Sequence, residues 1–84
     1  MTYRLTRRAY KQRTGNWREK FVLVVTAYLA NGHGRLFYNR RSEIAQATGL
    51  SERAVTRHLQ SLERQGLLAL DLTRAPATIQ LNFA

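Results

Sequence analysis

The segment from Ser42 to Leu68 constrains the fold of this 84-residue chain more than any other part of the sequence. It indicates two short helices joined by a tight turn. Gly49 suits the left-handed conformation with which many helices end. Ser51 can cap the following helix, because its hydroxyl can accept a hydrogen bond from a free backbone N–H of the first turn. We therefore predict a helix that ends at Gly49 and a second helix over Ser51–Gln65.

The predicted second helix has an apolar side and a basic side. At about 100° per residue, a narrow stripe that would face a core contains Val55, Leu59 and Leu62. The opposite side carries Arg53, Arg57, Gln60 and Arg64, with Thr56 at its edge. Arg and Gln have donors that suit guanine and adenine edges in the major groove of DNA, and Arg also pairs with phosphates. The ordinary alternative is a solvated face, which any surface helix of a basic protein displays.

Two alternating segments follow this helix. Leu68–Leu72 and Thr78–Phe83 alternate apolar and polar residues, the period of a strand with one buried face. Pro76 lies between them and cannot donate to a strand ladder, so it fits a loop. We predict a C-terminal β-hairpin with a turn at Thr73–Ala77, and a short strand at Arg35–Tyr38 that pairs with it.

An apolar helix is predicted upstream. Asn16 can cap it, and Glu19 can return the hydrogen bond in a variant of the capping box. One face of this helix, which we expect to pack in the core, contains Trp17, Phe21, Val24 and Tyr28. Stacking of aromatic rings on nucleic-acid bases is the alternative. The apolar run Phe21–Ala30 is shorter than the about 20 residues that span a bilayer, so we predict a core helix.

The N-terminal segment differs in kind, because it contains no acidic residue before Glu19. Its cations are Arg4, Arg7, Arg8, Lys11 and Arg13. We predict a basic arm over residues 1–15 that contacts DNA and orders on contact, followed by one folded domain over residues 16–84. Two alternatives stay open: a solvated tail, and packing of the apolar residues of the segment on the domain or on a second copy.

Composition excludes several classes of function. The net charge is +9, from 14 Lys and Arg against 5 Asp and Glu, and such a surplus attracts polyanions. The chain has no cysteine, which rules out disulfides and thiolate zinc sites. His33 and His58 have no obvious partner nearby in the sequence, and we place His58 at the margin of the core. The acidic residues are spread singly over expected surface positions. We predict no enzyme, no cofactor and no metal site, and a cytoplasmic, nucleoid-associated protein with no membrane role.

The stretch from Trp17 to Phe83 resembles a winged helix-turn-helix domain, similar to those of small bacterial, phage and plasmid regulators and of phage and plasmid replication proteins. The likeness is carried by Phe21–Leu23, Ala27, Asn31, Gly32, Gly34, Glu43–Ala45, Thr48–Val55, Leu59, Leu62–Arg64 and Gly66–Leu68. The pattern is departed from in two places: Ala54 stands where Thr or Ser is usual, and Tyr38-Asn39 where replication modules often have Pro-Ser. The resemblance implies an α+β fold with three helices and a C-terminal β-hairpin wing, after the basic N-terminal arm.

We expect the helix Ser51–Gln65 to enter the major groove of double-stranded DNA. The expected base-reading residues are Arg53, Thr56, Arg57 and Gln60. The expected phosphate contacts are Arg40, Arg41, Ser51 and Arg64. The expected wing contacts are Thr73 and Arg74, and those of the arm are its five cations.

The function expected on this basis is sequence-specific binding of double-stranded DNA by a transcriptional regulator that acts as a repressor. One alternative is the DNA-binding module of a plasmid or phage replication initiator or accessory factor. A protein-interaction winged helix is an alternative of another class. RNA binding is disfavoured, because no strand face is expected to expose an aromatic pair. A second copy on DNA and a larger replication or transcription partner remain open as further partners.

Overall fold

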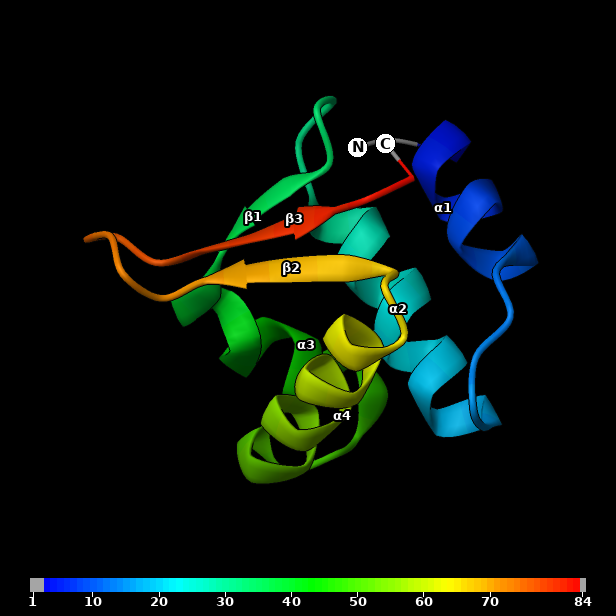
Figure 1. The fold of residues 1–84 in the computed structure, drawn as a ribbon. Helices are drawn as coiled ribbons and strands as arrows, with labels where there is room; N and C mark the ends of the chain where they lie inside the picture. Colours follow the sequence, from blue (N-terminus) through cyan, green and yellow to red (C-terminus); the bar gives the residue numbers. More distant parts are fainter. Residues whose placement is uncertain (1–2, 84) are drawn as a thin grey trace.

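A computed structural model describes residues 3–83 (Figure 1). Its elements, in chain order, are α1 (Tyr3–Lys11), α2 (Trp17–Leu29), β1 (Arg35–Phe37), the 3-10 helix η1 (Tyr38–Arg40), α3 (Arg41–Thr48), α4 (Glu52–Arg64), β2 (Leu68–Asp71) and β3 (Thr78–Leu81). Residues 1, 2 and 84, which the predicted arm and domain ranges include, lie outside the described residues. The α+β prediction is confirmed.

The three strands form one antiparallel sheet in the order β1-β3-β2. Leu36 of β1 lies opposite Ile79 of β3, and Ile79 lies opposite Leu70 of β2. Leu36 and Ile79 are buried, so one face of the sheet closes the core while the other meets solvent. The predicted hairpin and the predicted short strand are both present. The loop between β2 and β3 projects beyond the helices as a wing (Figure 1).

The turn between α3 and α4 has the predicted geometry. Gly49 ends α3 with φ 76°, and Ser51 caps α4 by accepting from the Ala54 N–H at 3.1 Å. The apolar stripe of α4 is completely buried and consists of Val55, Leu59 and Leu62. It packs with Ile44 of α3 and with the inner face of the sheet in one cluster. No side chain caps the first turn of α3.

The predicted core face of α2 is wrong. Trp17, Phe21 and Tyr28 are 66%, 39% and 48% exposed. The helix instead buries the side that contains Glu19, Val22, Leu23, Val25, Thr26 and Ala27. Apolar residues lie on almost every side of α2, so its sequence pattern alone does not select the buried one. The buried side also contains Thr26, whose hydroxyl donates to the Val22 carbonyl at 2.7 Å.

Residues 3–11, which we predicted to belong to an arm that orders on contact, form the regular helix α1. Leu5 and Ala9 of α1 are buried against the core, and α1 packs along α2. The Arg8 guanidinium donates to the Phe83 carbonyl at 2.9 Å, which ties α1 to the C-terminal segment. The fold therefore contains one helix more than the three predicted. Of the alternatives left open, packing on the domain is the one observed.

Candidate nucleic-acid interface

The outer side of α4 is a row of exposed polar side chains. It consists of Arg53, Arg57, Gln60 and Arg64, all exposed and all opposite the buried apolar stripe. Every group on this row can donate hydrogen bonds, and three of the four carry a positive charge. Glu52, at the first turn, places a negative charge near the positive end of the helix dipole. The predicted base-reading residues thus lie on one accessible side of one helix, apart from Thr56.

Thr56 and Arg41 are brought together by the packing of α3 on α4. The Arg41 Nη1 donates to the Thr56 hydroxyl at 2.7 Å, and its Nε donates to the Tyr38 carbonyl at 3.0 Å. The guanidinium carbon also lies 4.1 Å from the centre of the Tyr38 ring, within the range of a cation–π contact. Arg41 is therefore held in one orientation, with N–H donors left for a further acceptor.

Arg40, expected from the sequence to contact a DNA phosphate, pairs with a carboxylate of the protein itself, which the sequence did not indicate. Its Nη2 donates to Glu43 Oε1 at 2.7 Å, and its Nε contacts the other carboxylate oxygen. Hydrogen bonding by Arg40 holds the pKa of Glu43 below its ordinary value, and the same bond raises the pKa of Arg40. The charge of Arg40 is thus partly balanced within the protein.

The wing carries Thr73 and Arg74 at exposed positions. Thr73 bonds to the Asp71 carboxylate at 2.8 Å, and the Arg74 Nε lies 3.8 Å from the other oxygen of that carboxylate. Arg35 of β1, which the sequence reasoning missed, lines a hollow of about 420 Å³ together with Arg74. Arg35 precedes Leu36 in an alternating strand, so its outward position could have been inferred from the strand prediction.

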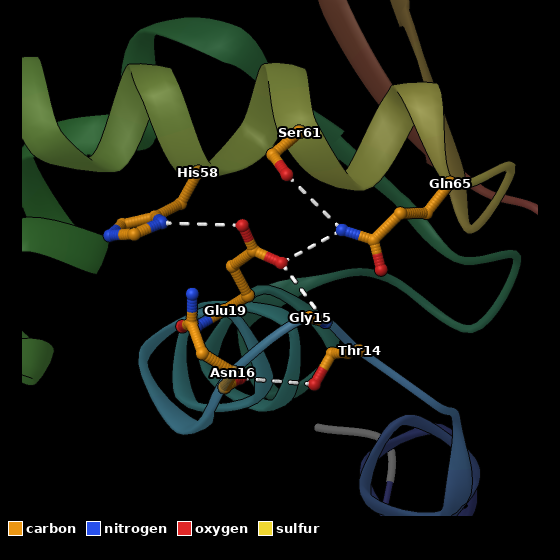
Figure 2. A network of polar contacts seen from close by, with 7 residues as sticks. All are labelled: Thr14, Gly15, Asn16, Glu19, His58, Ser61 and Gln65. Atoms are coloured by element: carbon orange, nitrogen blue, oxygen red, sulfur yellow. Dashed lines mark hydrogen bonds and ion pairs between the residues drawn. The ribbon is translucent and has the colours of Figure 1, made fainter.

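A polar network on the inner side of α4 was also missed (Figure 2). Glu19 of α2 is 7% exposed. Its side chain points toward His58 and Ser61 of α4 and toward Gln65, which directly follows α4. Its carboxylate accepts from the Gln65 side chain at 2.8 Å and from the Gly15 N–H at 3.2 Å. The His58 Nδ1 lies 3.9 Å from the other carboxylate oxygen. The expectation of a surface position for Glu19 is wrong, whereas His58 lies at the margin of the core as expected.

The same network sets the ionisation of Glu19. Burial raises the pKa of the carboxyl, but hydrogen bonds from Ser61, Gln65 and Gly15, with the nearby His58, outweigh it and leave the pKa below its ordinary value. An ionised carboxylate therefore links α2 to the inner side of α4. The contact lies on the side of α4 away from its exposed arginines.

The cations of α1 lie elsewhere on the molecule. Arg4, Arg7 and Lys11 are exposed, but α1 is on the side of the fold remote from the tip of the wing (Figure 1). Arg8 is engaged with the Phe83 carbonyl, and Arg13 follows α1 in the linker to α2. The cations predicted for the arm thus lie on α1 and in the linker after it, away from the tip of the wing.

Other kinds of site find no support among residues 3–83. This part of the chain contains no group of three or more His, Asp or Glu side chains that could hold a metal ion. Nor does it contain a helix with both the length and the apolar character needed to cross a membrane. We take α4, the start of α3 and the wing together as the candidate site, because they carry the exposed polar side chains described above.

Residues 40–69 match the family model described as winged helix-turn-helix DNA-binding. The matched range runs from η1 through α3 and α4 to the start of β2, so it contains the whole exposed row of α4. With the three-stranded sheet and the hairpin, it confirms the winged helix-turn-helix fold and supports DNA binding by this chain. No curated protein and no solved structure matches the chain.

Proposed function

We propose that this protein is a transcriptional regulator that binds double-stranded DNA at a preferred sequence. The observation that carries the proposal is the exposed row of α4, which lies within the segment matched to DNA-binding domains. An α-helix fits the major groove, where each base pair presents a distinct pattern of donors and acceptors. A buried stripe opposite the row and a capped N-terminus hold the helix rigid for such a contact.

In this proposal α4 lies in the major groove with Arg53, Arg57 and Gln60 toward the base edges. Arg suits the O6 and N7 acceptors of guanine, and Gln suits adenine. Thr56 assists from the edge of the row, because Arg41 holds its hydroxyl in place. The specificity would then come from a few side chains on one rigid element.

Phosphate contacts position the helix in the groove. We assign them to Arg41, to the Ser51 hydroxyl at the start of α4 and to Arg64 at the C-terminal end of the row. Arg40 would contribute less than Arg41, because Glu43 balances its charge. On the wing, Thr73 and Arg74 would meet the backbone or the neighbouring minor groove.

The cations of α1, with Arg13 in the linker after it, have a different role in this proposal. Arg4, Arg7, Arg8, Lys11 and Arg13 add to the net charge of +9 and so to the general attraction toward a polyanion. Their effect would be independent of the sequence of the duplex. We further propose that the protein is cytoplasmic and associated with the nucleoid. It would act as a repressor by occluding a promoter, without a catalytic step or a cofactor.

Selection from a random pool of duplexes tests the proposal, followed by titration of the selected duplex and a scrambled one at two salt concentrations. We expect a preference of about a thousandfold or more at physiological salt. Equal and steeply salt-dependent binding to every duplex would contradict it, because the arginines would then supply charge alone. The symmetry of the selected site would report whether one or two copies bind. A replication role would use the same contacts, and the location of the site at an origin or a promoter distinguishes the two.

A further inference from the structure

One side of α2 carries a row of large apolar residues, of which the aromatic ones are exposed and Val24 is partly buried against the core. We call this row the α2 stripe: Trp17, Phe21, Val24 and Tyr28. Its aromatic members are 66%, 39% and 48% exposed, in chain order. At a rise of about 1.5 Å per residue the stripe is about 16 Å long, or three helical turns. Exposed apolar residues that line up in this way mark interaction sites more often than single ones do.

A groove between α1 and α2 adjoins the stripe. It has a volume of about 420 Å³ and is lined by Thr6, Arg7, Tyr10 and Lys11 of α1 and by Val24 of the stripe. Lys20 of α2 crosses to α1, where its ammonium donates to the Tyr10 carbonyl and lies 5.3 Å from the centre of the Tyr10 ring. The groove meets the stripe at Val24, and we call the two together the α1–α2 surface.

The rim of the α1–α2 surface is positively charged. Arg7, Lys11, Arg18 and Lys20 lie along it, and Glu19, the one acidic residue between Tyr3 and Leu29, is buried on the opposite side of α2. The Arg18 guanidinium lies 4.9 Å from the centre of the Trp17 ring. Cations thus lie beside the apolar residues of the stripe. Neither α1 nor α2 exposes a carboxylate that could balance their charge.

From this arrangement we propose that the α1–α2 surface binds an acidic amphipathic helix of a partner protein. An apolar groove with a charged rim suits a helix that places apolar residues at every third or fourth position and carboxylates on both flanks. Trp and Tyr are frequent among residues that dominate binding energy, since they bury much area with little entropy loss. This surface is separate from α4 and the wing, so the proposal does not depend on duplex binding.

Two other occupants fit the surface less well. A second copy of this chain, packed about a two-fold axis, would bring the same cations of each copy close together, and such like-charge contacts are unfavourable. A single-stranded nucleic acid would need free ring faces for base stacking, but Arg18 covers one face of Trp17, the most exposed ring of the stripe. An acidic amphipathic helix would contact both the apolar residues of the stripe and the cations of the rim.

The test is a displayed library of 18-residue amphipathic helices, with the apolar positions restricted to Leu, Ile, Phe and Trp and the flanking positions varied among Glu, Lys, Gln and Ser. We expect the selected peptides to carry Glu on the flanks. Their affinity should fall about tenfold or more in both Trp17→Ala and Phe21→Ser. Both side chains are exposed, so the variants should keep the thermal unfolding midpoint of the parent.

Phe37→Ser is the matched control, because Phe37 is 52% exposed on β1 and lies off this surface; its peptide affinity should equal that of the parent. The variant Arg7→Glu with Lys11→Glu should shift the selected flanks from Glu toward Lys. Selection of no peptide, or of peptides unaffected by Trp17→Ala, would overturn the proposal. It would also be overturned if Trp17→Ala abolished self-association of the free protein, or weakened duplex binding, since a second copy or DNA would then occupy the surface.

Discussion

Arg57 is exposed in the middle of α4, on the row assigned to base contacts. We predict that Arg57→Ala costs about 1–3 kcal/mol of binding free energy on the selected duplex and relaxes the preference over a scrambled one. The reason is that a bidentate contact with one base is lost, while the general attraction changes by only one charge. Titration of both duplexes by fluorescence anisotropy measures the two effects.

Arg13→Ala is the control for that substitution, since it removes the same charge from an exposed position outside α4. It should weaken the two duplexes alike and leave their ratio unchanged. If Arg57→Ala behaved in the same way as Arg13→Ala, the assignment of α4 as the recognition helix would be wrong.

Glu19 gives the stability of the protein a dependence on pH. Its pKa is held below the ordinary value of 4.5, so its contribution is present above about pH 4.5 and is lost as the pH falls through the lower pKa of the folded state. Glu19→Gln removes the charge-assisted hydrogen bonds and should cost about 1–2 kcal/mol at pH 7. The difference from the parent should shrink on acidification.

Urea unfolding between pH 7 and pH 3 measures this effect. Glu43→Gln serves as the comparison, because Glu43 is an exposed carboxylate paired with Arg40 at the surface, where ion pairs contribute little. A constant difference between Glu19→Gln and the parent over the whole pH range would show that folding does not lower the pKa of Glu19, and would contradict this account.

At the scale of elements, α1 is part of the fold through Leu5 and Ala9. Leu5→Ala should lower the free energy of unfolding by about 2–3 kcal/mol, because it removes buried apolar volume and leaves a cavity. Arg4→Ala, on the exposed side of the same helix, should change it by less than about 0.5 kcal/mol. Chemical denaturation distinguishes a packed helix from an arm that orders only on contact with DNA. Equal unfolding midpoints for Leu5→Ala and Arg4→Ala would indicate the arm.

The α3–α4 turn depends on one backbone conformation. Gly49 has φ 76°, and a Cβ built on it would meet no heavy atom within 4 Å, so the cost of a side chain there is conformational. Gly49→Ala should destabilise the protein by about 1 kcal/mol. Gly32 has equally open surroundings and no such φ, so Gly32→Ala should be neutral or slightly stabilising in the same thermal unfolding experiment. Equal effects of the two substitutions would contradict this account.

At the scale of the whole molecule, cations outside α4 also contribute to the net charge of +9 that attracts DNA. The combined change of Arg4, Arg7 and Lys11 to Ala removes exposed cations of α1 without touching α4. It should weaken binding to selected and scrambled duplexes by the same factor and reduce the slope of log affinity against log salt. Loss confined to the selected duplex would instead place α1 in the specific contact.

The sequence by itself predicted the elements whose residues differ clearly from one side to the other. The basic row and buried stripe of α4, the glycine turn before it and the alternating hairpin all follow from local periodicity and capping. These patterns are local, so they required no knowledge of what packs against them. The exposed arginine row of the candidate site could therefore be predicted from the sequence almost completely.

Only the tertiary structure decided the parts that depend on distant residues. The apolar residues of α2 surround the helix, so its buried side was selected by the packing of α1 and α4 on it rather than by periodicity. Glu19 and Gln65 are far apart in the sequence, and their contact exists because α2 lies against α4. Leu5 and Ala9 lie four residues apart, which is compatible with one side of a helix, but it is the surface that α2 offers them that makes α1 part of the fold.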